Sequence, residues 1–311
     1  MDKQPKISII IPVYNVQEYL SACLHSALKQ TLFDIEIICV NDGSQDDSSK
    51  ILEDFSKTDY RISIVNKENG GLSSARNAGM KHANGQLIMF LDSDDMFDEK
   101  ACERVWREYQ NGGFDIITFS TSIIPEFPRA SEWYYHNLSI QTQQFEEFRP
   151  SILFQKNGSI PFVWRQAYKR ELLLKNDLFF DESVGFGEDT VFQAEVFPHA
   201  EKFSYICDHL YFYRWYRIGS LMEKYKTNLK DKFDRHLYIV KKILEYWDKE
   251  RWIASYGEDL FAWIINFLQF DGYLPDKEQK ADAIRMLKSY DCQRYIKKRK
   301  VRKEYRSFLG L

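Results

Sequence analysis

The chain has 311 residues, of which 44% are hydrophobic and 16% aromatic, so it can bury a sizeable core and is not a disordered protein. No apolar run approaches the roughly 20 residues that cross a bilayer, and the five scattered cysteines show neither a disulfide framework nor zinc-ligand spacing. The net charge is −3, but residues 294–306 hold eight Lys or Arg and one Glu, which leaves 35 basic and 45 acidic residues elsewhere. We therefore expect a soluble, unsecreted, cytoplasmic protein with an acidic body and a basic tail.

Apolar runs and helical patterns alternate through the first hundred residues. Residues 7–13 and 35–40 are β-branched runs typical of strands buried on both faces, and residues 16–28 carry apolar side chains at helical spacing. Further strands are predicted at 62–65 and 87–91. This order predicts an α/β fold with a mostly parallel, Rossmann-like central sheet flanked by helices.

Polar residues follow the carboxyl ends of these strands. Asn15, Asp42, Asn69 and the run from Asp92 to Asp95 lie there or just beyond. In open α/β sheets, ligands bind at this edge. The sequence therefore predicts four loops that converge on one polar site.

The rest of the chain divides into two regions. Residues 101–220 continue the alternating pattern, with a strand at 116–119, and complete a first domain at 1–220. Residues 221–311 carry two apolar helical stripes. We expect them to form a C-terminal helical extension that ends in the basic tail.

Three carboxylates in four residues directly follow a buried strand, in the run Asp92-Ser93-Asp94-Asp95. Like charges this close repel one another unless a cation lies among them, and Mg²⁺ or Mn²⁺ with oxygen ligands is the natural partner. The alternative is a solvated acidic turn that caps the next helix. The motif alone does not decide between the two.

Five segments of the sequence occur in an order that is typical of one enzyme family. They read IIIPVYN at 9–15, VNDGS at 40–44, NGGLSSARN at 69–77, FLDSDD at 90–95 and GEDT at 187–190. This pattern resembles glycosyltransferase family 2, whose members are inverting enzymes with the GT-A fold. The resemblance implies transfer of a sugar from a nucleotide-diphosphate donor to a hydroxyl group. Residues 1–100 would bind the nucleotide-sugar and residues 101–220 the acceptor.

The resemblance also implies which residues bind the donor. Pro12, Tyr14 and Asp42 match positions that hold the base, with Asp42 accepting from the uracil imide of a UDP-sugar, and Arg76 matches an arginine that offsets the diphosphate or holds Asp42 in place. Asp94 and Asp92 match the D-x-D motif, which binds Mn²⁺ or Mg²⁺. The implied nucleotide-sugar contacts are Pro12, Tyr14, Asn15, Asp42, Asn69, Gly71, Arg76, Asp92, Ser93, Asp95, Arg214 and Ser220.

The chain departs from the family pattern at two positions. Asn41 stands where many relatives carry a first aspartate, which weakens the assignment of uracil as the base. Tyr216 stands where several relatives carry a late histidine. Whether a protein residue outside the aspartate cluster binds the metal therefore stays open.

Inversion requires a base that removes the proton of the acceptor hydroxyl. Glu188 and Asp189 supply two adjacent carboxylates in a glycine-flanked turn before a helix. The resemblance places the base at Asp189. The alternative is an acidic N-terminal cap, because carboxylates favour the first turn of a helix.

The acceptor is not identified by the sequence. Trp164 and Tyr168 are candidates for acceptor contacts, although core packing explains such aromatic residues equally well. The resemblance commonly implies bacterial cell-surface polysaccharide synthesis on a glycan or lipid-linked saccharide. The basic tail would then hold the enzyme at the anionic inner face of the cell membrane, with about 1 kcal/mol from each basic residue. The alternative is a solvated basic helix.

Two other functions are compatible with parts of the pattern. A nucleotidyltransferase usually has a glycine-rich N-terminal loop with Arg and Lys, which residues 12–15 do not form. A catalytically degenerate nucleotide-sugar-binding protein would lack the metal carboxylates or the base, and both are present. We expect no nucleic-acid partner, because the body is acidic and contains no recognisable binding module.

Overall fold

The computed structural model describes residues 4–124, 137–154, 162–215, 228–270, 272–296 and 303. The chain forms two compact units, one made of Met1–Phe148 with Lys156–Tyr216 and the other of Arg149–Gln155 with Arg217–Leu311. The predicted division at residue 220 lies close to this one. The assignment of residues 149–155 to the first domain was wrong, because Phe154 packs against Trp247 and Trp263 of the second unit.

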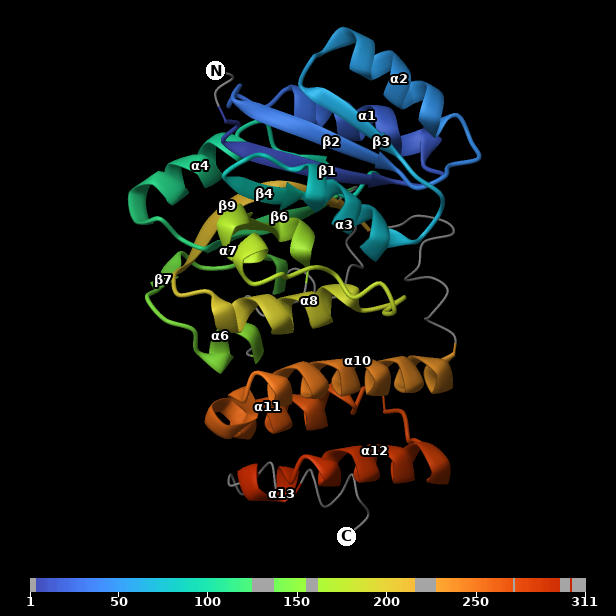
Figure 1. Cartoon of the computed structure of the whole chain (residues 1–311), viewed down its shortest axis with the longest axis vertical. Coiled ribbons are helices and arrows are strands. Elements are labelled where there is room, and N and C mark those ends of the chain that lie inside the picture. Colours follow the sequence, from blue (N-terminus) through green and yellow to red (C-terminus); the bar gives the residue numbers. More distant parts are fainter. Residues whose placement is uncertain are drawn as a thin grey trace. The chain divides into compact units, whose positions relative to one another are not determined.

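In the described ranges, the first unit contains one mixed sheet of nine strands. Figure 1 labels most of them. The strand order is β3-β2-β1-β4-β8-β6-β9-β5, and β7 pairs with β9 outside this path. The pairs β1–β2, β1–β4, β2–β3 and β6–β9 are parallel, whereas β5, β7 and β8 pair antiparallel with their neighbours. The strands are β1 (Ile7–Val13), β2 (Ile35–Asn41), β3 (Ile62–Asn66), β4 (Leu87–Phe90), β5 (Met96–Phe97), β6 (Ile116–Ile124), β7 (Gln143–Phe145), β8 (Gln166–Lys169) and β9 (Phe203–Arg214).

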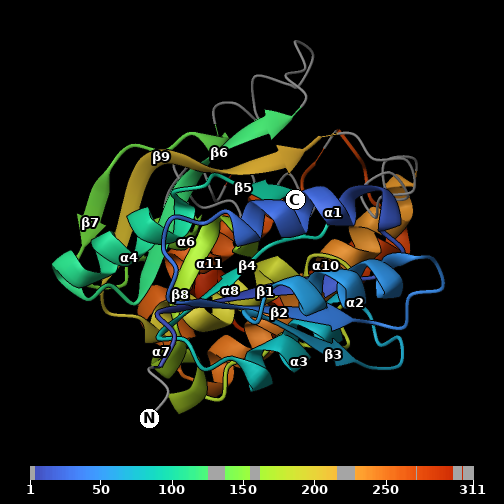
Figure 2. The ribbon, with the colours of Figure 1, turned by 90° about the horizontal axis from the view of Figure 1, so that it is seen from above.

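Helices cover both faces of this sheet. All seven residues of β1 are buried, because Ile9 and Ile11 face the core under α1 whereas Ile10 faces α3. A methyl group at Gly79 of α3 would overlap the Ile10 side chain, so the small residues of α3 permit its close packing. Figure 2 shows α1 and α3 on opposite sides of β1 and β2. The helices of this unit are α1 (Gln17–Leu28), α2 (Ser48–Thr58), α3 (Leu72–His82), α4 (Ala101–Gly112), α7 (Arg170–Lys175) and α8 (Glu188–Val196), with the 3₁₀ turns η1 (Val163–Arg165) and η2 (Phe197–His199).

The second unit is helical in the part that the structure describes. Asn228 and Asp276 cap α10 and α12, with Asp276 and Gln279 forming a capping box. The Tyr295 ring stacks on Phe261 at a centroid distance of 5.7 Å, which fixes the last short helix. No helix in the described ranges is long and apolar enough to span a bilayer. The helices are α6 (Pro150–Phe154), α10 (Leu229–Lys249), α11 (Trp252–Phe267), α12 (Lys277–Ser289) and α13 (Cys292–Tyr295).

Some predicted features lie outside the described residues. These are Ser220, Tyr216 and most of the basic tail, namely residues 297–302 and 304–311. Their predicted roles stay predictions.

Candidate active site

The loops after β1 and β2 lie side by side, because Val13 and Asn41 are paired at the ends of these parallel strands. The Asp42 N–H donates to the Val13 carbonyl oxygen at 2.9 Å, and the Asn15 N–H donates to Ser44 Oγ at 3.2 Å. Pro12 is buried in β1, whereas the Tyr14 side chain is 46% exposed. The tyrosine predicted to contact the base is therefore accessible.

Asp42 anchors the glycine turn that begins α3. Its Oδ1 accepts from the Gly70 N–H at 3.0 Å and from Lys67 Nζ at 2.6 Å, and its Oδ2 accepts from the Gly71 N–H at 2.8 Å. Gly71 has a φ of 86°, a left-handed conformation that favours glycine, whereas Asn69 is exposed beside the turn. The predicted donor residues Asp42 and Gly71 are thus joined by a hydrogen bond, and Asn69 lies in the same glycine turn.

The aspartate cluster after β4 splits into two groups that face different partners. Asp95 is 2% exposed, and its carboxylate accepts from the Tyr211 O–H at 2.7 Å and from the Arg214 N–H at 2.6 Å. Burial raises the pKa of the Asp95 carboxyl well above its usual range. The predicted role of Asp95 at the donor stays a prediction, and the structure adds that this carboxylate fastens the loop to β9. Ser93 is also buried, whereas Asp92 and Asp94 keep partial exposure.

Arg214 holds the same loop from β9. Its Nε donates to the Asp94 carbonyl oxygen at 2.8 Å, and its guanidinium lies 4.8 Å from the centre of the Tyr19 ring. The predicted phosphate contact stays a prediction. What the structure adds is that Arg214 fixes the backbone at Asp94, the predicted metal ligand.

Arg76 is buried and joins two distant segments of the chain. Its Nη2 donates to Asp92 Oδ1 at 3.0 Å, and its Nη1 donates to Glu188 Oε1 at 3.0 Å and to Asp189 Oδ1 at 2.6 Å. The side chain is 1% exposed, and its Nε has no hydrogen-bond partner among the described residues. The predicted contact with Asp42 was wrong, because the guanidinium points to these three carboxylates instead. Burial lowers the pKa of this guanidinium, but the neighbouring carboxylates raise it more.

The Asp189 carboxylate lies at the start of α8 without capping it. The N-cap is Gly187, with a φ of 75° and no side-chain cap, and Asp189 Oδ2 instead accepts from the Val163 N–H at 3.3 Å. Burial raises the pKa of the Asp189 carboxyl well above its usual range, against the effect of Arg76, and the Glu188 carboxylate raises it further. Asp189 therefore lies in the first turn of α8, where carboxylates are favoured, but is not its N-cap residue. A raised pKa suits a carboxylate that accepts a proton.

Trp164 and Tyr168 lie in the core and do not present their rings to an acceptor. Trp164 is 3% exposed and stacks on Tyr211 and Tyr213 at centroid distances of 4.5 and 5.2 Å. Tyr168 is fully buried against Phe90, and its O–H donates to Gln166. The predicted acceptor contacts are thus corrected, and Trp164 instead packs under Tyr211, which binds the aspartate loop.

Comparison with known proteins identifies the family. The sequence model described as "Glycosyl transferase family 2" matches residues 8–175, more than half of the chain. The chain belongs to glycosyl transferase family 2. The family match ends before α8, so Glu188 and Asp189 lie outside the matched segment.

Curated glycosyltransferases and a teichoic acid biosynthesis protein resemble the chain over most of its length. The Uncharacterized glycosyltransferase EpsJ of Bacillus subtilis is 37% identical over 68% of this chain and 61% of its own length. Glycosyltransferase GlyA of Streptococcus pneumoniae is 34% identical over 84% of this chain and 38% of its own length. The Minor teichoic acid biosynthesis protein GgaA of B. subtilis is 28% identical over 97% of this chain and 70% of its own length. The chain thus spans less than two thirds of EpsJ and GlyA.

Solved structures share the fold. S. aureus TarS 1-349 in complex with UDP superposes with a TM-score of 0.68 at 20% identity, covering 97% of this chain and 91% of that one. The mannosyltransferase PcManGT from Pyrobaculum calidifontis, in complex with GDP-Man and Mn²⁺, gives a TM-score of 0.56 at 13% identity, covering 99% and 81%. The predicted GT-A fold, an α/β sheet flanked by helices with helices at the C-terminus, is confirmed.

A divalent cation fits the donor atoms that this member of glycosyl transferase family 2 offers. Among the described residues, no group of three or more His, Cys, Asp or Glu side chains could hold a metal by itself. Mg²⁺ and Mn²⁺, however, commonly take one or two carboxylates and complete their shell with substrate phosphates and water. Asp92 and Asp94 supply such oxygens. Three carboxylates, those of Asp92, Glu188 and Asp189, share the single charge of Arg76, so a further cation would offset an excess of negative charge.

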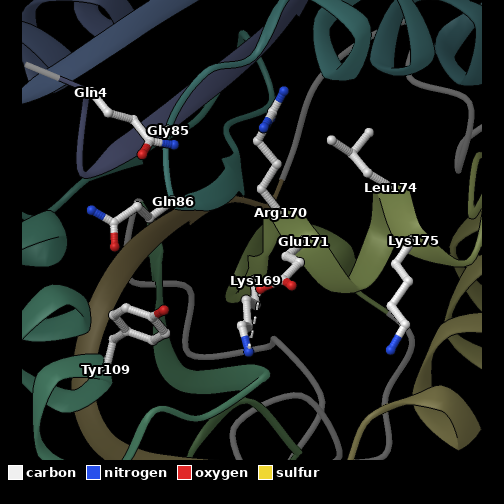
Figure 3. A pocket seen from close by; sticks show the side chains of 9 residues that line it. All are labelled: Gln4, Gly85, Gln86, Tyr109, Lys169, Arg170, Glu171, Leu174 and Lys175. Atoms are coloured by element: carbon white, nitrogen blue, oxygen red, sulfur yellow. Dashed lines mark ion pairs between the residues drawn. The ribbon is translucent and has the colours of Figure 1, made fainter.

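A cavity of about 520 Å³ lies at the opposite edge of the sheet from these residues (Figure 3). Gly85 and Gln86, which precede β4, and Lys169, which ends β8, belong to its wall, and Lys169 forms an ion pair with Glu171. No residue predicted to bind donor, metal or acceptor lines it. The cavity is therefore separate from the residues predicted to bind the donor and the metal.

Sequence reasoning missed two residues of the site. Tyr211 accepts from the Asp92 N–H at 3.2 Å while donating to Asp95, and Lys67 contacts Asp42. Tyr211 lies in an aromatic run that is typical of a core strand, so its sequence context did not indicate a role in the site. Lys67 lies two residues before the NGG turn, and a cation so close to a predicted donor-binding loop was the signal available.

Proposed function

We propose that the chain is an inverting, metal-dependent hexosyl- or N-acetylhexosaminyl-transferase that takes its sugar from a nucleotide-diphosphate donor. The observation that carries this proposal is the Arg76 bridge, which brings Asp92 of the donor loop and Asp189 of α8 to one guanidinium. A direct displacement at a sugar carbon requires that the phosphates of the donor and the group that accepts the proton lie close together.

UDP is the proposed nucleotide. TarS has been solved with UDP and with UDP-GlcNAc, and PcManGT with GDP-Man. The exposed Tyr14 ring and the adjacent Asp42 carboxylate support base binding at the ends of β1 and β2.

Asp94 and Asp92 would hold Mn²⁺ or Mg²⁺. Bound there, the ion would neutralise charge on the diphosphate and so stabilise the leaving nucleoside diphosphate. Arg214 supports the assignment, because its bond to the Asp94 carbonyl oxygen holds the loop in place.

Asp189 would act as the base. The acceptor hydroxyl oxygen bonds to the anomeric carbon while the bond from that carbon to the phosphate oxygen breaks, and the hydroxyl proton passes to the Asp189 carboxylate. Attack opposite the leaving group inverts the configuration. Arg76 and the Val163 N–H hold the carboxylate in one orientation.

The proposed acceptor is a hydroxyl group of a glycan or a lipid-linked saccharide in bacterial cell-surface polysaccharide synthesis. The names of the relatives support this class: besides GgaA, they include a Poly(ribitol-phosphate) beta-glucosyltransferase, 31% identical over 70% of this chain. Such an acceptor fits a cytoplasmic enzyme held at the inner face of the membrane by its basic tail, as we also propose.

A panel of nucleotide-sugars tests the proposal. Each nucleotide-sugar is incubated with the protein and Mn²⁺ or Mg²⁺, and the released nucleoside diphosphate is measured. We expect slow, chelator-sensitive hydrolysis of one UDP-sugar. If no nucleotide-sugar is hydrolysed or bound with either ion, the proposal is wrong.

A further inference from the structure

The Lys67 ammonium group lies at the base-binding end of the sheet. It follows β3, and its Nζ lies 2.6 Å from Asp42 Oδ1 and 2.6 Å from the Glu68 carbonyl oxygen. An ammonium group has three donors, so one N–H of Lys67 is left after these two bonds. The Lys67 side chain is 23% exposed, compared with 3% for Asp42. Lys67 is therefore the more accessible side chain of the pair.

The Asp42 carboxylate has little acceptor capacity left. Lys67 and the Gly70 N–H occupy Oδ1, and the Gly71 N–H occupies one position of Oδ2. A carboxylate offers about four acceptor positions, so one remains on Oδ2. Lys67 and Asp42 together thus offer one donor next to one acceptor.

This donor and acceptor pair complements only some base edges. Uracil and guanine carry a carbonyl oxygen next to a ring N–H, which matches the donor of Lys67 and the acceptor of Asp42. Cytosine and adenine carry an amino group next to a ring nitrogen that accepts. Their edges would place a donor against the ammonium group and an acceptor against the carboxylate.

We propose that Lys67, acting with Asp42, selects nucleotides whose base carries a carbonyl next to a ring N–H, and rejects those with an amino group there. The inference rests on the proposed function, because it requires a nucleotide at the ends of β1 and β2. The exposed Tyr14 ring, which follows the residue paired with Asn41, provides a face on which such a base stacks. Lys67 is a specificity-determining residue in this proposal.

The comparison of UDP with CDP isolates this effect, because the two differ only at the edge that Lys67 and Asp42 would contact. A hydrogen bond to a charged group corresponds to a factor of roughly 10 to 100 in affinity. We expect the full-length protein with Mn²⁺ to bind UDP at least about tenfold more tightly than CDP. The measurement is isothermal titration calorimetry.

Three variants test the role of Lys67. In Lys67→Met the ammonium donors are lost, so UDP affinity should fall while CDP affinity changes little, and the preference should shrink to about threefold or less. Lys67→Gln keeps a neutral donor and should give an intermediate preference. Lys50→Met removes a positive charge from an exposed position on α2, without a contact to Asp42, and should leave the preference unchanged.

Each outcome separates the two proposals. If wild type binds UDP and CDP equally, or if both Lys67 variants keep the full preference, Lys67 does not select the base although nucleotide binding stands. If wild type binds no nucleoside diphosphate, the proposed function fails and this inference fails with it. If Lys67→Met unfolds, the preferences of wild type and Lys67→Gln still decide.

Discussion

Arg76 Nη1 lies 2.6 Å from Asp189 Oδ1, although 113 positions separate the two residues in the sequence. The same guanidinium reaches Asp92 through its other terminal nitrogen. The loop that follows β4 and the first turn of α8 are therefore fixed to each other by one buried cation. Arg76 therefore positions both the proposed base and the donor loop.

Loss of the Arg76 charge should destabilise the fold. Arg76→Met would leave Asp92, Glu188 and Asp189 without their buried cation, and removing one partner of a buried pair typically costs about 3–5 kcal/mol. Arg104→Met is the matched control, because Arg104 makes a similar two-bond contact with Asp208 at side-chain exposures of 30% and 36%. The control should cost less than about 1 kcal/mol. Urea unfolding of both variants gives the comparison, and equal losses would argue against a structural role for the bridge.

Asp189→Asn should abolish most sugar transfer while sparing donor binding. Asparagine keeps the size of the side chain but cannot take the proton, so the rate should fall by roughly 10²–10⁴-fold. Glu188→Gln should cost less, since Glu188 contacts Arg76 beside the base. Steady-state rates and UDP affinities of the two variants are the measurements. Near-normal transfer by Asp189→Asn, with UDP still bound, would place the base elsewhere.

The pH dependence of kcat/KM should report the raised pKa of Asp189. Only the deprotonated carboxylate accepts a proton, so activity is lost as pH falls through a pKa that burial holds above the ordinary value of about 3.9. Glu188→Gln removes a neighbouring negative charge that raises this pKa. The acidic limb should therefore move to lower pH in Glu188→Gln. Rate profiles measured from about pH 4 to about pH 8 would cover the expected shift. If the acidic limb of Glu188→Gln is the same as that of the wild type, another group controls this limb.

UDP binding should require a divalent cation and the Asp94 carboxylate. Asp94→Ala should lose metal-dependent UDP affinity but keep the contact with Arg214, because that contact is made through the Asp94 backbone carbonyl oxygen. Asp54→Ala, at an exposed position of α2, is the control for loss of one carboxylate. Calorimetry with Mn²⁺ and with chelator checks this. Equal UDP affinity in the two conditions would contradict the proposed metal site.

The basic tail should bind anionic membranes. A chain that ends at Ile296 is the appropriate truncation, because an earlier end at Asp291 would also remove Tyr295, whose ring packs on Gly257 and Phe261. Flotation with anionic liposomes should recover the full-length protein and not the truncated one, with about 1 kcal/mol lost per basic residue removed. Neutral liposomes serve as the control. Equal flotation of both chains would favour a solvated basic helix.

The sequence by itself determined the order of the elements in the first hundred residues. Their strands are continuous β-branched runs that must be buried on both faces, and Ile7–Val13 and Ile35–Asn41 form there as neighbouring parallel strands. Parallel strands end at one edge, so the polar loops at Tyr14, Asp42 and Asp92 had to meet. Local composition and periodicity suffice for such features.

Only the tertiary structure decided which polar groups face one another. Arg76 could be read as a surface residue of an amphipathic helix, but packing of α3 and α8 buries it among three carboxylates. Asp95 and Asp94 are adjacent residues of the same type, but only the Asp95 carboxylate is held by Tyr211 and Arg214 of β9. Contacts between residues a hundred positions apart depend on the packed geometry of several elements. No local pattern in the sequence encodes that geometry.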